Sequence, residues 1–194
     1  KLPDVLTVEE VDELVNSFDL SKPEERRNRA IVETLYSCGL RVSELVGLRM
    51  SNLYFNDGYI IVEGKGKKQR LVPISEKAIK EIRPYIDDRR SLDIKRGNEN
   101  ILFLNRRGTQ LTRVMIFYII KRACERCGIR KKVSPHTLRH TFATHLWEGG
   151  ANLRAIQQML GHESITTTEI YTHLDRQFLR QEILQHHPRN KKTL

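Results

Sequence analysis

Signals that begin and end helices recur along almost the whole chain, and they restrict its fold more than any other feature. A Ser, Thr or Asn side chain can accept a free amide hydrogen of the first helical turn, and glycine readily adopts the left-handed conformation that ends a helix. The start signals are Thr7 with Glu10 as a capping box, Ser75, Thr112, Ser134 followed by Pro135, and Asn152, and the stop signals are Gly39, Gly128 and Gly161.

These signals predict the helices of the chain. The first helix begins after Thr7 and runs to about Phe18, and the second spans about 24–38. A short third helix lies at 41–45, with Ser43 as a candidate N-cap. Six further helices are expected. One begins after Ser75, one runs from Thr112 to Gly128, and one begins at Ser134. The others run from Asn152 to Gly161, over 167–173 and over about 175–185. We expect residues 87–100 to form a loop and residues 186–194 to form a frayed, basic tail.

Two runs of β-branched and apolar residues interrupt the helical pattern, at 59–62 and 70–74. The glycine-rich, basic segment 64–69 between them is typical of a hairpin tip. Residues 101–104 predict one more short strand. The expected fold class is therefore mainly α with a small antiparallel β-sheet (α+β), and the length of 194 residues fits one domain.

The net charge of +10 indicates an anionic partner, either nucleic acid or an anionic membrane, although a merely soluble basic protein is the alternative. No apolar run approaches the roughly 20 residues of a membrane span, and the first residues resemble no signal peptide. The three cysteines suit a reducing cytoplasm. Cys124 and Cys127 have the spacing of half a zinc site, but no second pair exists, so we expect cysteines of a helix core.

Arg139 is the first candidate for chemistry. In the helix opened by Ser134, Leu138, Phe142 and Leu146 form a stripe of roughly 80°, and Arg139 lies only about 20° outside it. A partly buried guanidinium needs an anion. The anion could be a phosphate, with His136 on the same side of the first turns, or an internal carboxylate.

Arg41 and Lys65 are weaker candidates when each is taken alone. Arg41 precedes a helix start, where Glu44 could hold it, and an ordinary salt bridge is the alternative reading. Lys65 lies between two glycines at the predicted hairpin tip, where it could reach a leaving oxygen or form a solvated turn. Lys67 and Lys68 compete for the same role.

His162 follows a helix stop, and Tyr171 lies on the next predicted helix among threonines, including Thr167 and Thr168, that could bond DNA phosphates or cap helices. Two arginines match the non-bridging oxygens of a phosphodiester, and a tyrosine can act as a covalent nucleophile. No His-Glu-x-x-His motif and no clear carboxylate cluster is present in the sequence. We therefore expect neither a metal nor another cofactor.

Four segments carry a family resemblance, at 34–45, 64–74, 134–146 and 160–173. In this order and spacing they resemble the catalytic domain of the tyrosine recombinases of the phage-integrase family, in its Xer branch. The resemblance implies the tyrosine recombinase catalytic-domain fold over residues 1–194. It implies the catalytic residues Arg41, Lys65, His136, Arg139, His162 and Tyr171, with Glu44 as a supporting acid. From the residues themselves we expect Lys67, Lys68, Thr167 and Thr168 to bind DNA.

The implied reaction is site-specific DNA cleavage and rejoining. Tyr171 attacks the scissile phosphate to form a 3′-phosphotyrosyl link, and Lys65 protonates the departing 5′-oxygen. Arg41, Arg139 and His162 hold the non-bridging oxygens, and His136 assists. The implied role is chromosome-dimer resolution or mobile-element integration and excision, and the alternative is relaxation of DNA by a topoisomerase of type IB.

The resemblance also implies partners. These are double-stranded DNA, other recombinase subunits in a tetramer on DNA, and a septal DNA translocase if the role is chromosome-dimer resolution. The helix at 175–185 would dock on a neighbouring subunit through Phe178, Leu179, Ile183 and Leu184, or would pack within its own subunit. We expect the protein in the cytoplasm, on the nucleoid, and we expect that the N-terminal core-binding domain of the family is absent from this chain.

Overall fold

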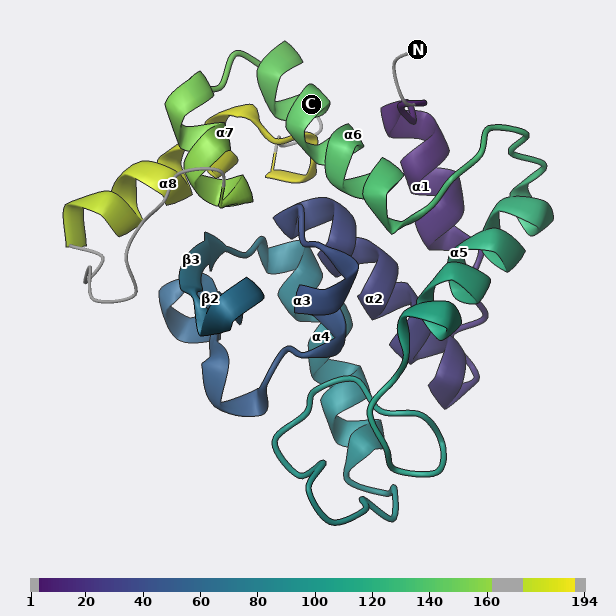
Figure 1. Cartoon of the computed structure of the whole chain (residues 1–194). Helices are drawn as coiled ribbons and strands as arrows, with labels where there is room; N and C mark the ends of the chain where they lie inside the picture. The colour runs from purple at the N-terminus through teal and green to yellow at the C-terminus, as the bar shows by residue number, and fades with distance from the viewer. Residues whose placement is uncertain (1–3, 162–172, 191–194) are drawn as a thin grey trace.

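The computed structural model describes residues 4–161 and 173–190, so the helix expected at 167–173 lies almost wholly outside the described residues. The helices are α1 (Val8–Asn16), α2 (Pro23–Cys38), α3 (Val42–Val46), α4 (Glu76–Arg89), α5 (Arg113–Cys127), α6 (Pro135–Glu148), α7 (Leu153–Leu160) and α8 (His173–His186) (Figure 1). The strands are β1 (Leu53–Tyr54), β2 (Tyr59–Glu63) and β3 (Gln69–Pro73). A mostly helical chain with one small antiparallel sheet confirms the predicted fold class.

The helix boundaries follow the predicted signals with one exception. Thr7 and Glu10 form the capping box of α1, and Gly39, Gly128 and Gly161 end their helices in the left-handed conformation. The prediction that Ser43 caps α3 was wrong, because α3 begins at Val42 and Arg41 is the N-cap. The Glu44 carboxylate accepts the Arg41 backbone amide, and the N-cap therefore lies two residues before Ser43.

The predicted hairpin is confirmed. Strands β2 and β3 pair antiparallel from Tyr59 opposite Pro73 to Glu63 opposite Gln69. Strand β1, which pairs with β2, was not predicted, since two residues are too short to show alternation. The strand expected at 101–104 was wrong: Ile101 and Leu104 form only isolated bridges. Leu102, Phe103 and Leu104 are buried all the same, without a partner strand in the described sheet.

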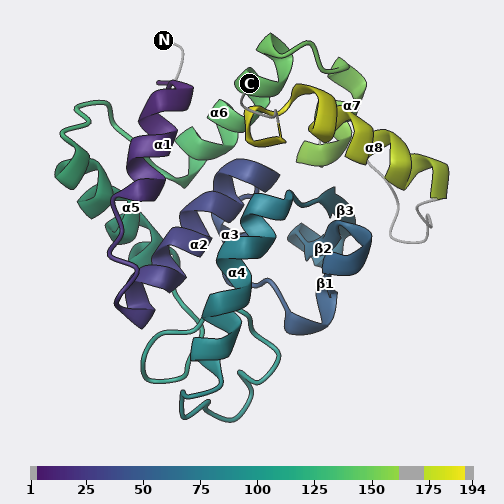
Figure 2. The same cartoon turned by 180° about the vertical axis from the view of Figure 1, so that it is seen from behind.

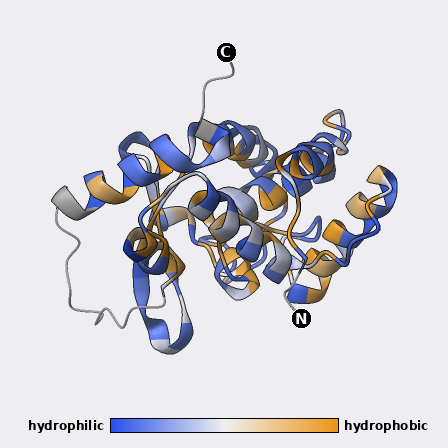
Figure 3. Ribbon diagram, turned by 90° about the horizontal axis from the view of Figure 1, so that it is seen from above, coloured by the Kyte–Doolittle hydropathy of each residue, from blue (hydrophilic) through white to orange (hydrophobic). Residues whose placement is uncertain are grey.

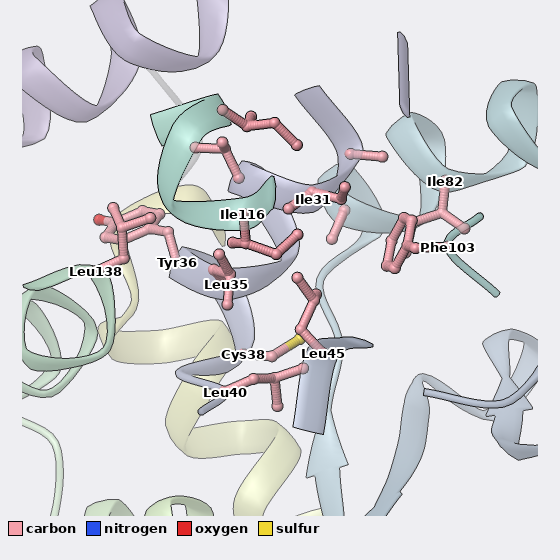
Figure 4. Close-up of a cluster of buried hydrophobic side chains, with 14 of the residues drawn as sticks. Ile31, Leu35, Tyr36, Cys38, Leu40, Leu45, Ile82, Phe103, Ile116 and Leu138 are labelled. Atoms are coloured by element: carbon pink, nitrogen blue, oxygen red, sulfur yellow. The ribbon is translucent and has the colours of Figure 1, made fainter. Parts of the chain in front are cut away.

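Helix α2 runs through the centre of the molecule, with α1, α4 and α5 around it (Figures 1 and 2). Every residue from Ala30 to Cys38 is buried, and Ile31, Leu35 and Cys38 contribute to the larger hydrophobic core (Figure 4). Burial raises the pKa of the Cys38 thiol and raises that of Cys124 to about 11. The prediction of core cysteines is therefore confirmed for these two, and Cys127 is partly exposed.

A second hydrophobic cluster joins the C-terminal helices to the sheet. Phe142 and Leu146 of α6 pack there with Met159 of α7, Leu179 of α8 and Leu71 of β3. With Leu138 in the larger core, the predicted stripe of α6 is wholly buried. Hydrophobic and hydrophilic positions alternate along the helices when the molecule is seen from above (Figure 3), as expected for helices with one buried face.

Helix α8 packs on its own chain. Leu179 and Ile183 are buried in the second cluster, whereas Phe178 and Leu184 are exposed. Half of the apolar stripe predicted for subunit contact is therefore covered within the subunit. The helix begins at His173, two residues before the predicted start at 175. None of the helices in the described part of the chain has the length and apolar character needed to cross a membrane.

The prediction of a frayed tail from residue 186 was wrong for the residues that the structure describes. His186 ends α8, and His187 is completely buried, with its ring 4.9 Å from that of Tyr36. Arg189 forms ion pairs with Glu33 of α2, at 3.3 Å, and with Asp12 of α1. A basic segment lies in the interior here because a buried carboxylate far away in the sequence offers it a partner.

We expect Arg189→Ala to destabilise the fold by roughly 3 kcal/mol, because it leaves the fully buried Glu33 carboxylate without its charged partner. Urea denaturation measures the free energy of unfolding. Arg90→Ala is the matched control, since it removes an exposed ion pair with Asp87 and should cost less than about 1 kcal/mol. Equal effects of the two substitutions would contradict the prediction.

Candidate active site

Arg41 is positioned by the start of α3. Its backbone amide donates to Glu44 Oε1 at 2.8 Å, and its guanidinium lies 3.6 Å from Glu44 Oε2. The Arg41 side chain is 45% exposed while that of Glu44 is completely buried. Glu44 therefore contacts both the backbone and the side chain of Arg41, and the Arg41 guanidinium remains partly exposed.

Glu44 has a second cationic partner, Arg70 of β3, which the sequence reasoning did not select. Arg70 donates through Nη2 to Glu44 Oε1 at 3.0 Å and through Nη1 to Glu44 Oε2. Its Nε donates to the Met159 carbonyl at 2.8 Å. This side chain thus joins the Arg41 segment, the hairpin and the end of α7.

Arg139 lies on the buried side of α6, as its helical position predicted, and is only 7% exposed. It donates to the carbonyl oxygens of Gly39 at 2.7 Å and Leu160 at 2.6 Å. Within the described residues it forms no ion pair with a carboxylate, so the internal-carboxylate alternative is not what the structure shows. Burial, with a smaller contribution from the charge of Arg41, lowers the Arg139 pKa to about 10.

Lys65 begins the turn at the tip of the β2–β3 hairpin and is exposed. It lines, together with Arg41, a cavity of about 560 Å³. The lining also includes three further cationic residues, which are Lys68 and Arg70 from the hairpin and Arg113 from the start of α5. Gly161, directly after α7, lines the cavity as well. Segments far apart in the sequence therefore bring several positive charges to one hollow of the surface.

The structure does not place the remaining predicted site residues in the lining of this cavity. His136 is exposed on the first turn of α6, three residues before Arg139, and Lys67 is exposed at the hairpin tip. Neither belongs to the lining of the cavity as the structure describes it. His162, Tyr171, Thr167 and Thr168 lie outside the described residues.

The arrangement suits an anion. Three arginines and two lysines surround or border the cavity, and Glu44 and Glu63 are the carboxylates in its described lining. A buried guanidinium that is held by neutral carbonyls keeps its charge and gains from a nearby phosphate. Residues 4–161 and 173–190 contain no group of three His, Cys, Asp or Glu side chains that could hold a metal ion.

Two residues were missed by the sequence reasoning, Arg70 and Arg113. A signal for Arg70 does exist: it is an arginine inside an apolar strand, where a buried charge requires a partner. Arg113 had no such signal, because the first residue of a helix is a common place for a solvated arginine. Only the folding of α5 against α3 brings it to the cavity.

Residues 4–177 match the family described as the phage integrase family. The chain therefore belongs to this family. It is 47% identical to tyrosine recombinase XerD of Staphylococcus haemolyticus over 189 residues, which are 97% of this chain and 64% of the relative. It is 45% identical to tyrosine recombinase XerD of Chlorobaculum tepidum, over 97% of this chain and 63% of that one. The chain thus spans somewhat less than two thirds of these relatives.

Solved structures of recombinases have the same fold as this chain. The crystal structure of XerA recombinase superposes with a TM-score of 0.75 and 38% identity, covering 97% of this chain and 66% of that chain. The XerH site-specific recombinase bound to its difH substrate, in a pre-cleavage complex, has a TM-score of 0.75 and 29% identity, covering 84% and 48%. The fold predicted from the resemblance is confirmed by these likenesses.

We expect Gly39→Ala to destabilise the protein by about 3 kcal/mol, because a Cβ there would lie 2.3 Å from the Phe142 ring and φ is +66°. The substitution also disturbs the carbonyl that binds Arg139. Gly66→Ala is the control: its φ is +72°, but a Cβ would meet nothing within 4 Å, so only the backbone cost of about 1 kcal/mol applies. Thermal unfolding of both variants checks the difference, and a loss at Gly39 no larger than at Gly66 would contradict it.

Proposed function

We propose that the chain is the catalytic domain of a tyrosine site-specific recombinase, which cleaves and rejoins DNA strands through a 3′-phosphotyrosyl intermediate. The observation that carries the proposal is the cationic cavity lined by Arg41 and Lys65. The buried Arg139, held by two carbonyls, supports it, although its side chain does not belong to the described lining of that cavity. The relatives named above are recombinases, which favours recombination over the relaxation of supercoiled DNA.

The residues of the site divide the reaction between them. Arg41 and Arg139 hold the non-bridging oxygens of the scissile phosphate, where their forks stabilise the charge that builds up in the transition state. Lys65, on a tip with a glycine at φ +72°, protonates the 5′-oxygen as it leaves. His162 holds the non-bridging oxygens with the two arginines, His136 assists, and the phenol oxygen of Tyr171 attacks the phosphorus. The transfer conserves the number of phosphoester bonds, so it needs neither a nucleotide cofactor nor a metal.

The proposed partners follow from the same reaction. Double-stranded DNA binds the cationic surface, with Lys67, Lys68, Thr167 and Thr168 as contacts to its backbone, and four subunits act together on two DNA sites. Docking of α8 on a neighbour uses the exposed Phe178 and Leu184, because Leu179 and Ile183 are buried within their own subunit. The protein acts in the cytoplasm on the nucleoid, in chromosome-dimer resolution with a septal translocase or in the movement of a mobile element.

We expect Tyr171→Phe to abolish the covalent protein–DNA adduct on a nicked suicide substrate while DNA binding persists, because only the phenol oxygen is removed. The reaction is run in chelator, and the adduct is measured by denaturing gel electrophoresis. Tyr118→Phe, at an exposed tyrosine on α5, is the control and should react like the wild type. An adduct that survives Tyr171→Phe would assign the nucleophile elsewhere.

We expect Arg41→Ala and Arg139→Lys to slow cleavage by about a hundredfold or more, as does the loss of other donors to a charged transition state. Single-turnover cleavage of the suicide substrate measures the rate. Arg107→Ala removes one exposed charge outside the cavity and is the control for the general loss of positive charge. Similar rates for all three variants would show that the arginines attract DNA without acting on the phosphate.

A further inference from the structure

Arg70 connects the parts of the candidate site more directly than any residue assigned above. Its guanidinium binds both oxygens of Glu44, and Glu44 in turn binds the backbone and side chain of Arg41. Arg70 and Glu44 are both buried. The two-pronged contact fixes the direction of the carboxylate, and hence the place at which Arg41 leaves the start of α3.

Arg70 also contacts the C-terminal end of α7. Arg70 Nε donates to the carbonyl of Met159, and Arg139 donates to the carbonyl of the next residue, Leu160. The last carbonyls of a helix have no partner within the helix and favour positive charge. Two arginines from β3 and α6 therefore converge on consecutive carbonyls, and both depend on the position of the same helix end.

Gly161 allows this approach. Its φ is +74°, and a Cβ at this position would lie 3.0 Å from Cδ of Arg70. The side chain of Arg70 thus packs against the turn that follows α7. His162, one of the predicted catalytic residues, is the next residue in the chain.

Arg70 also belongs to the hairpin that carries Lys65. It lies on β3, opposite Val62 of β2, and the Gly64 amide closes the tip with a 2.7 Å bond to the Lys68 carbonyl. The base of the tip is therefore tied to α3 and α7 by one side chain. The tip itself, with Lys65, is exposed.

We propose that Arg70 is a positioning residue, which holds Arg41, Arg139 and the Lys65 hairpin in the relative arrangement that cleavage requires. The proposal rests on the proposed function above. Arg70 touches none of the reacting atoms in this scheme and acts through Glu44 and the α7 carbonyl. Its loss therefore changes the rate of the chemical step much more than the affinity for DNA.

The test compares Arg70→Met and Arg70→Lys in the natural full-length protein. At saturating enzyme, Arg70→Met slows single-turnover cleavage of a nicked suicide substrate by about a hundredfold, since misplacement of about 1 Å costs that much. Arg70→Lys restores part of the rate, because lysine keeps the charge but cannot bind Glu44 and Met159 together. The dissociation constant for DNA changes by no more than about threefold in either variant.

Arg89→Lys is the matched control. Arg89 is as buried as Arg70 and also binds backbone carbonyls, those of Glu99 and Ile101, but it does not line the cavity. It reports the effect of disturbing a buried arginine on the fold alone. Cleavage by Arg89→Lys at wild-type rate supports the proposal, and a loss equal to that of Arg70→Lys at the same stability overturns it.

Glu44→Gln tests the link itself. Glutamine keeps an oxygen that can accept the Arg41 amide but removes the charge that Arg70 neutralises. If the two residues act as one unit, the double variant with Arg70→Met cleaves no more slowly than the slower single variant. Multiplication of the two single effects would mean that they act independently, and the proposal would be wrong.

A second measurement separates this proposal from the proposed function. Hydrogen exchange of the backbone amides in 41–46 and 156–161 does not depend on catalysis. Arg70→Met should raise exchange in both segments, and Arg89→Lys should raise it in neither. Unchanged exchange in the Arg70 variant overturns the positioning role even if the protein cleaves DNA. The opposite outcome is also possible: Arg70→Met raises exchange in both segments, but the wild-type protein forms no covalent adduct with DNA. That result would support the structural role of Arg70 and refute the proposed function.

Discussion

The burial of one carboxylate, that of Glu44, governs the arrangement of the candidate site. A buried charge of this kind is tolerated only when it is paired and hydrogen-bonded, and here Arg70, the Arg41 amide and the Arg41 side chain meet the requirement. These partners come from α3 and β3. The need to satisfy Glu44 therefore brings the hairpin and the start of α3 together, and it leaves the Arg41 guanidinium facing the cavity.

Arg139 shows the complementary case. It is buried, yet its described partners are the neutral carbonyls of Gly39 and Leu160. The carbonyls orient the guanidinium without neutralising it, so a positive charge is held ready in a place of low solvation. The ends of α2 and α7 supply both carbonyls, and each helix ends in a glycine with positive φ. The helix stops that define the fold thus also orient the Arg139 guanidinium.

The C-terminal segment 186–190 contains basic residues that are buried rather than solvated. The His187 ring contacts the rings of Tyr36 and Phe142, and Arg189 pairs with Glu33 in the interior. The same segment connects α8 to the central helix, so the helix proposed for contact between subunits is anchored at its far end. Its exposed Phe178 and Leu184 remain on the surface.

The sequence by itself determined the helices, the hairpin and the candidate side chains, because caps, glycine stops and hydrophobic periodicity act over a few neighbouring residues. The resemblance to the recombinases added the roles of Arg41, Lys65, His136 and Arg139, and it named His162 and Tyr171. Only the tertiary structure decided what those side chains meet. Arg70 binds a carboxylate 26 positions away and a carbonyl 89 positions away, and Arg189 finds Glu33 across 156 positions. Such partners are chosen by packing of whole elements, which no local pattern encodes.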